Sequence, residues 1–463
     1  MVSCSIKPSR EQWVIICGIL EICILGQNFS TWPTQETVLR EEGYFSDKTE
    51  EQRNRIFARI YTMMILYSCI HGLILGFVLD LKGFWAVRSI YHVEQIIAII
   101  LMLIKSPENS WIVYIAYPMF YGSCSAILFF FAPTLNLDPK NRGTWFAYQG
   151  IGVSVASQLY VLYRHMDNRR WFWVMNLCFQ PFSIWRTFNQ LPRTNKIEVG
   201  CNLGWESRHD RIEVAESSDE QNEQKQAKTS STLLQGLQGF AEIAKSPSLW
   251  FGILWIFFEQ NSYDCFMTQF EPWLIWASDG DEETKNFFLD IQIYFILGGI
   301  IFGMTSGKLF NTFDQYLVKK KGYKANYATI LVSCTWFTVS CFLIAIEFFC
   351  YSFQATGVNL WIAMVANSLA RRIYIFNLFL VASVPKELFG RARAFVLIFE
   401  TLFCLLPPLW IFIINEVFNG EFHVIELIYS GMGLLSLSGP LMIYLYWFKY
   451  VPESRYEKMC DDL

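Results

Sequence analysis

Charged residues are scarce in this chain of 463 residues, since Lys, Arg, Asp and Glu together make up only 17% of it. Soluble globular proteins carry about a quarter. Hydrophobic residues make up 53% of the chain and recur in long runs, many of about 20 residues, which is enough to cross a bilayer. The shortage of charge argues against a soluble domain. A net charge of −4 without a basic arm also argues against nucleic acid as a partner.

Histidine and the usual catalytic motifs are scarce as well. The five histidines form no His/Asp or Cys/His pair of the kind that a membrane enzyme would use. The 13 cysteines are scattered, mostly inside apolar runs, and show neither a CxxC motif nor a Cys/His metal spacing. The chain also has no glycine loop of the phosphate-binding type. We therefore expect a protein that is not an enzyme and uses no metal or cofactor.

The apolar runs predict an all-α, polytopic membrane protein with twelve transmembrane helices. An even number of spans puts both termini on one side, and the excess of Lys and Arg in the short segments of that side predicts that both are cytoplasmic. The first run is long enough to be an uncleaved span rather than a signal peptide. The expected spans are residues 13–32, 57–79, 89–104, 111–135, 144–163, 171–191, 249–275, 287–309, 327–349, 359–384, 394–415 and 424–448.

The chain divides into two similar halves around a polar segment. Residues 193–247 contain "AESSDEQNEQKQAKTSS", which cannot bury a core and is expected to be a largely disordered cytoplasmic linker. The expected domains are a six-helix bundle at 1–192 and a second at 248–463. "GILEICILGQN" in span 1 matches "GILWIFFEQN" in span 7, and Gly76 matches Gly303. Such a parallel repeat relates the two halves of major facilitator transporters.

The loop after span 2, "GFVLDLKGFWAVR", contains Gly76, Asp80, Gly83 and Arg88. It resembles the signature loop of the major facilitator superfamily, although Phe84 and a tryptophan stand where the family has a basic pair. Gly76 would allow two helices to approach closely, and Gly83 would permit a tight turn. Asp80 could cap a neighbouring helix or pair with an arginine. The resemblance implies that this loop gates transport by latching the two halves together.

Several further stretches resemble solute carrier family 43. They include "GILEICILGQNFSTWP", "WRTFNQLPR" and "VPKELFGRARAF". This resemblance implies sodium-independent, facilitative transport of a small polar organic solute by alternating access. The substrates expected are purine nucleobases or large neutral amino acids. We also expect a monomer in the plasma membrane, with the small-molecule substrate and the lipid bilayer as its partners.

Ionisable residues near the middle of three spans predict the substrate site. Glu21, Glu259 and Arg371 lie near the middle of spans 1, 7 and 10, which line the central cavity in the superfamily that the chain resembles. Charge at this depth normally faces a partner or a wet cavity. Arg371 would bind a carboxylate or a purine acceptor edge, and a glutamate would accept from an amine. Polar neighbours, chosen mainly by helical spacing, complete the predicted site: Asn28, Ser123, Gln260, Tyr263, Asn367 and Tyr374.

Other readings of the same residues stay open. The arginine and glutamates could hold the halves together without touching substrate. Glu21 could couple transport to protons, which would make the protein a symporter, or the protein could be a receptor or scaffold that moves nothing. Three secondary expectations concern single residues: Trp32 ends span 1 at the membrane interface, His71 stands alone, and Glu94 and Glu347 lie at wet helix ends.

Overall fold

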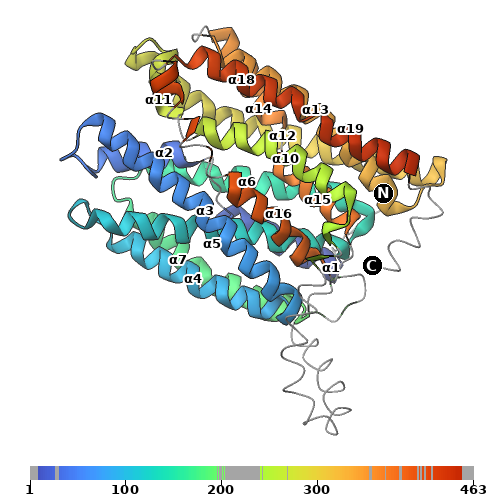
Figure 1. Ribbon diagram of the computed structural model, residues 1–463. Helices are drawn as coiled ribbons and strands as arrows, with labels where there is room; N and C mark the ends of the chain where they lie inside the picture. The colour runs from blue at the N-terminus through green and yellow to red at the C-terminus, as the bar shows by residue number, and fades with distance from the viewer. Residues whose placement is uncertain are drawn as a thin grey trace, which may run out of the picture.

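The protein is described here from a computed structural model, in which helices pack as two layered groups (Figure 1). The structure describes residues 9–26, 31–194, 243–267, 270–353, 357–370, 372–384, 388–403, 413–418 and 421–450, with a few isolated positions between them. The regular elements in this part of the chain are helices. Most of the predicted linker, 193–247, lies outside the described residues.

The first group of helices comes from the part of the chain before the linker. It consists of α1 (Arg10–Leu25), α2 (Trp32–Glu41), α3 (Glu50–Lys82), α4 (Phe84–Ile104), α5 (Val113–Phe131), α6 (Arg142–His165) and α7 (Arg170–Gln190), with short 3-10 turns η2 (Pro107–Ile112), η3 (Ala132–Leu137) and η4 (Pro139–Asn141).

The second group follows the linker. It consists of α10 (Pro247–Met267), α11 (Phe270–Ala277), α12 (Glu282–Lys321), α13 (Ala325–Tyr351), α14 (Gly357–Ala370), α15 (Arg372–Ser383), α16 (Phe389–Phe403), η8 (Ile413–Val417), α18 (Phe422–Leu435), α19 (Ser438–Leu445) and η9 (Tyr446–Tyr450).

Each of the twelve predicted spans overlaps a described helix, and the predicted fold class is confirmed. Five helical stretches are long and apolar enough to cross a membrane on length and composition, within the residues described: 52–82, 84–104, 107–137, 325–351 and 422–450. Several helices extend past the apolar run. Helix α12 is the main example, because the polar residues at both of its ends continue the helix beyond the predicted span 287–309. Helix boundaries are the part of a sequence prediction that hydropathy locates least well.

Span 1 is the clearest error in the predicted boundaries. Helix α1 ends at Leu25, and Trp32 begins the separate helix α2. Trp32 is 1% exposed and packs its ring against Phe57, Tyr61 and Tyr117. It is therefore a core residue rather than an interfacial anchor. A new helix begins at Trp32 because Pro33 stands in its first turn, where proline is favoured.

Local sequence signals set several helix ends. Ser9 and Gln12 form a capping box at the start of α1, and Thr49 and Gln52 form one at the start of α3. Helix α12 ends at Gly322, whose φ of 70° is in the left-handed region that glycine adopts easily. Its last turn carries three lysines at 319–321, whose positive charges interact favourably with the negative end of the helix dipole.

The two groups contact each other most closely along two pairs of helices, α3 with α16 and α6 with α12. Glycines make both contacts possible. A Cβ atom on Gly76 would lie 2.5 Å from the Gly390 carbonyl oxygen, and one on Gly307 would lie 2.4 Å from the Ala147 side chain. Small residues let helix backbones approach this closely. The repeat predicted Gly303 as the match of Gly76, and the glycine that makes the equivalent contact stands one turn later.

These contacts lie at one end of the molecule. Helix α1 begins there, α19 and η9 end there, and the α3–α4 turn lies there too, whereas α2 and α11 lie at the opposite end (Figure 1). At the α2 end, Glu41 and Glu42 form ion pairs with Arg164, Arg169 and Lys105. Burial lowers the pKa of Lys105, and the carboxylate of Glu42 opposes that shift. This network ties α2 to the ends of α4 and α6 and to the start of α7.

Asp138 joins three elements at the end where α1 begins. Its carboxylate accepts hydrogen bonds from Gln12 Nε2 at 3.2 Å, Trp145 Nε1 at 2.9 Å and the Asn141 amide. Partial burial raises the pKa of Asp138, but these hydrogen bonds outweigh it and hold the pKa below its usual value. Asp138 thus stabilises the fold in its charged form.

Replacing Asp138 with asparagine should lower stability at neutral pH by up to about 1 kcal/mol, because the site is half-exposed and screened by solvent. The difference should vanish as the pH falls through about 4 and below, where the wild-type carboxyl becomes protonated in both folded and unfolded states. Thermal unfolding in detergent at several pH values measures this. The exposed D167N variant is the control, and an Asp138 effect that persists in acid would contradict the assignment.

Candidate functional site: buried charges and the contact between the halves

Glu21 lies in a charged cluster inside the first helix group. Its carboxylate accepts hydrogen bonds from Arg88, from Ser183, and from Arg186 Nη1, the last at 2.7 Å. Glu21 is 0% exposed, Arg88 1% and Arg186 3%. Arg88 also donates to Thr187 Oγ1 at 3.1 Å. The cluster joins α1, α4 and α7, which all belong to the same half.

The composition of this cluster makes Glu21 structurally important. One carboxylate faces two guanidinium groups, so the cluster carries a surplus of positive charge within the apolar core. Removing one partner of a buried ion pair leaves the other charge uncompensated, which typically costs about 3–5 kcal/mol. The contacts of Glu21 therefore support the structural interpretation that the sequence left open. They account for both of its oxygens without a substrate.

The other described residues of the predicted substrate site also have partners in their own half. Glu259 on α10 accepts a hydrogen bond from Ser340 Oγ of α13 at 2.6 Å, and Asn367 on α14 donates to Glu347 of α13, also at 2.6 Å. Ser123 is buried, and its hydroxyl donates to the Phe120 carbonyl within α5. Glu21 and Glu259 are thus held by different sets of helices.

The remaining predicted substrate residues are only partly covered by the structure. Asn28 and Arg371 lie outside the described residues. Gln260 and Tyr263 lie on α10, and Tyr374 lies on α15, but their side chains are not described. The proposed meeting of Arg371 with Glu21 and Glu259 therefore stays a prediction.

The acidic residue of the signature loop makes the contact between the halves. Asp80, at the end of α3, accepts hydrogen bonds from the backbone N–H groups of Gly390 at 3.1 Å and Arg391 at 2.8 Å, and from Arg391 Nε at 2.9 Å. Gly390 and Arg391 lie in the first turn of α16, where unpaired N–H groups and the positive end of the helix dipole favour a carboxylate. Asp80 therefore caps a helix of the opposite half.

A second contact between the halves lies on α6 and α12. Asn311 on α12 accepts from the backbone N–H of Gly143 at 2.9 Å and donates to Thr144 Oγ1 at 2.6 Å. Like Asp80, it is a polar side chain that satisfies the first turn of a helix in the opposite half. We call these two contacts, Asp80 with Gly390 and Arg391, and Asn311 with Gly143 and Thr144, the latch.

The other residues of the signature loop have different roles. Gly83 has a φ of 80°, and a Cβ atom there would lie 2.0 Å from the Arg193 carbonyl oxygen, so the tight turn requires glycine. Arg88 was expected in the gating motif, but it points into the Glu21 cluster instead. Its position five residues past Gly83 places it within α4, too far along that helix to reach the latch.

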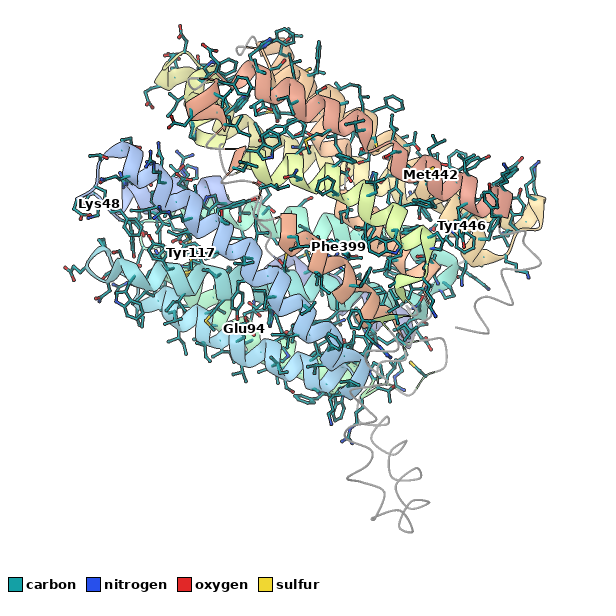
Figure 2. All side chains as sticks on the ribbon, viewed as in Figure 1. Lys48, Glu94, Tyr117, Phe399, Met442 and Tyr446 are labelled. Carbon is teal, nitrogen blue, oxygen red and sulfur yellow. The ribbon has the colours of Figure 1, made fainter. Side chains whose placement is uncertain are left out.

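Two expectations about ionisable residues are wrong. Glu94 and Glu347 are buried rather than wet, at 7% and 0% exposure. Glu94, on α4 beside α3 (Figure 2), accepts from Tyr67 and pairs with His71 Nε2 at 2.5 Å, so His71 is not alone. The sequence could not show these partners because the pairs join different helices. Among the described residues, no group of three or more His, Cys, Asp or Glu side chains could hold a metal ion.

Comparison with known proteins gives the fold its name. No protein-family model and no curated protein sequence matches the chain. Solved structures do match along nearly the whole length. One is the proton:xylose symporter XylE of the major facilitator superfamily, at 13% identity and a TM-score of 0.62, covering 95% of this chain and 96% of that one. This protein has the major facilitator fold.

A second structure with the major facilitator fold supports the same assignment. It is the human organic anion transporter MFSD10, at 12% identity and a TM-score of 0.62, covering 94% of this chain and all of the other. At these identities the likeness shows the architecture alone. The latch helices α3, α16, α6 and α12 overlap the predicted spans 2, 11, 5 and 8 of this chain.

Of two residues that the sequence analysis missed, Arg186 and Asn311, one could have been found in the sequence. Arg186 is a charged residue inside the apolar run 171–191, so the rule that marked Arg371 should also have marked it. Its presence in the same half as Glu21 would have suggested a local pair. Asn311 gave no such signal, because an asparagine in the polar end of a helix has no charge and no motif.

Replacing Glu21 with glutamine should destabilise the protein strongly, by about 3–5 kcal/mol, because Arg88 and Arg186 then lose their buried counter-charge. Thermal unfolding in detergent checks this. The triple variant E21Q/R88Q/R186Q, which removes all three charges, should recover part of the loss. An E21Q variant as stable as the wild type would contradict the structural role of Glu21.

Proposed function

We propose that this protein is a membrane transporter that moves a small polar organic solute by alternating access. The single observation that carries the proposal is the latch at one end of the two halves. It consists of a few hydrogen bonds and one ion pair over close glycine contacts. Such a contact can break and re-form, whereas the buried Glu21 cluster ties together three helices of the first half. Rocking of two rigid bundles is the motion that major facilitator transporters use.

The side of the membrane on which the latch lies follows from the charge bias. The latch lies at the end where α1 begins and α19 ends (Figure 1). We place this end in the cytoplasm, because positively charged loops favour the cytoplasmic side. The conformation would then be closed to the cytoplasm. Arg164 and Arg169, two basic residues at the opposite end, form ion pairs with Glu41 there.

For the substrate we propose a purine nucleobase or a large neutral amino acid, taken up without sodium. The support is the resemblance of "WRTFNQLPR" and "VPKELFGRARAF" to solute carrier family 43, together with the ability of Arg371 to bind a carboxylate or a ring acceptor through its planar fork. The two arginines around Glu21 favour its charged form. They support facilitative transport over proton coupling through that residue.

Breaking the latch should change which state the protein occupies. In D80A, the first turn of α16 loses its cap and Arg391 loses its counter-charge. The closed contact should weaken by about 3 kcal/mol, or roughly two orders of magnitude in population. Spin labels on K82C and K319C, in a background cleared of reactive cysteines, would report this as a new longer distance in pulsed electron resonance.

The matched control for this experiment is D138N. It removes a carboxylate at the same end, but its partners Gln12, Asn141 and Trp145 all lie in the same half. Its label distances should equal those of the parent. An unchanged distance distribution in D80A, or an equal change in D138N, would mean that Asp80 does not control the separation of the halves.

Transport itself is tested with the purified protein in liposomes. Uptake of labelled adenine should be saturable, independent of sodium and of a pH gradient, and reduced by more than tenfold in R371A, because the arginine would be the main polar contact of the substrate. Labelled leucine is the parallel probe for the amino-acid class. Binding of either compound without uptake would indicate a receptor, and normal uptake by a correctly folded R371A would assign Arg371 to the scaffold.

A further inference from the structure

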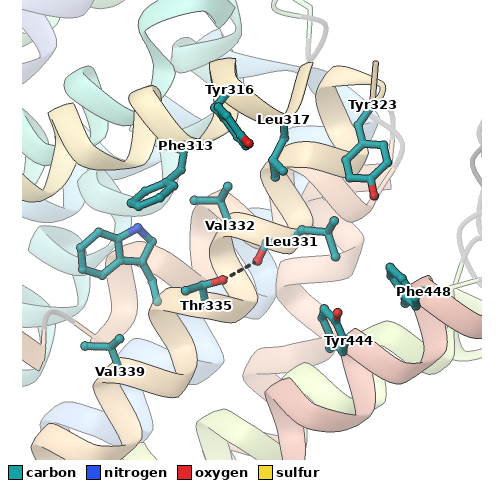
Figure 3. Close-up of a pocket in the computed structure, with 11 residues that line it drawn as sticks. Phe313, Tyr316, Leu317, Tyr323, Leu331, Val332, Thr335, Val339, Tyr444 and Phe448 are labelled. Carbon is teal, nitrogen blue, oxygen red and sulfur yellow. Dashed lines mark hydrogen bonds between the residues drawn. The ribbon is translucent and has the colours of Figure 1, made fainter. Parts of the chain in front are cut away.

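A groove on the outer face of the second half is unrelated to the latch. It lies between α12, α13 and the α19–η9 segment and has a volume of about 480 Å³, within the range of small-molecule sites. Phe313, Tyr316 and Tyr323 lie on one side, and Tyr444 and Phe448 lie across from them (Figure 3). The lining is almost wholly apolar and aromatic.

The groove opens to the surroundings of the helix bundle. Phe313, Tyr316, Val339, Tyr444 and Phe448 are between 42% and 59% exposed. In a multi-pass membrane protein, such a surface faces lipid chains. Tyr444 and Phe448 stack on each other with ring centroids 5.5 Å apart, which gives that wall a flat face. An elongated, aliphatic chain fits a groove of this shape and polarity.

One end of the groove is strongly basic. Lys319, Lys320 and Lys321 form the last turn of α12, beside the lining residues Tyr316 and Leu317. All three lysines are exposed, and none forms an ion pair with another described residue. The Lys320 ammonium lies 5.6 Å from the centroid of the Tyr316 ring, so the basic turn and the aromatic wall are in direct contact.

We propose that this groove binds one anionic phospholipid, with an acyl chain along the aromatic walls and its headgroup phosphate against the lysines of α12. The apolar groove and the cationic rim are adjacent, and a phospholipid joins an apolar chain to an anionic headgroup over the same short distance. Basic pockets between transmembrane helices recognise anionic headgroups in this way. A zwitterionic lipid would fill the groove but gain little from the lysines.

The test uses the full chain, purified in detergent and depleted of lipid, with lipid binding counted by native mass spectrometry. Phosphatidylserine and phosphatidylcholine with identical chains are the probes. The wild type should bind phosphatidylserine at least tenfold more tightly. In K319Q/K320Q/K321Q this preference should fall by about fivefold for each lysine that contacts the headgroup. Binding of phosphatidylcholine should change little.

Two further variants keep the result decisive. K82Q/K140Q/K245Q removes three exposed lysines outside the groove, and it should keep the preference for phosphatidylserine. Thr335 lines the groove and is exposed, so T335W should fill the groove and reduce binding of both lipids while the unfolding temperature stays near that of the wild type. Equal losses in both lysine triples, unchanged binding in T335W, or full competition by inorganic phosphate would each overturn the proposal.

Discussion

The contact between Asp80 and the first turn of α16 is the interaction on which the arrangement of the two halves depends. A carboxylate at a helix N-terminus gains from the unpaired N–H groups and from the helix dipole together. Here the helix belongs to the other half, so a local capping interaction becomes a long-range one. Gly76 and Gly390 are part of the same device, because a side chain on either would keep the backbones apart and the carboxylate out of reach.

The charges of the protein fall into two physical classes. Glu21 with its arginines, Glu94 with His71 and Glu347 with Asn367 are buried within one half. Asp80 with Arg391 joins the halves, and the side chain of Asp80 is 1% exposed whereas that of Arg391 is 16% exposed. Breaking a pair inside one half leaves both charges buried at a cost of several kcal/mol, whereas water can reach the two charges of a pair between the halves once the halves separate. A moving interface needs pairs of the second class.

Much of the fold could be predicted from the sequence, because hydrophobic runs of membrane length have few alternatives to a helix. The signature loop predicted Asp80 as a helix cap or ion-pair partner, because a carboxylate near a helix end can accept from backbone N–H groups or pair with an arginine. The partner's identity was not readable, because Gly390 lies 310 residues away. Arg88 shows the limit of motif reading: the spacing suggested a gate, but only the packing of α4 on α7 places its guanidinium beside Glu21.

The depth of a charged residue in its span indicates its role less well than the direction in which its side chain points. Glu21 lies at mid-span, as a substrate ligand would, yet it faces α4 and α7 of its own half. A helix presents several faces at any depth, and hydropathy cannot distinguish the face toward a cavity from the face toward a neighbour. Had Glu21 paired across the halves, the rocking motion proposed above would have had to expose a buried charge. Pairing Glu21 inside one half removes that cost from the proposed motion, in which the latch contacts would be the polar ones to break.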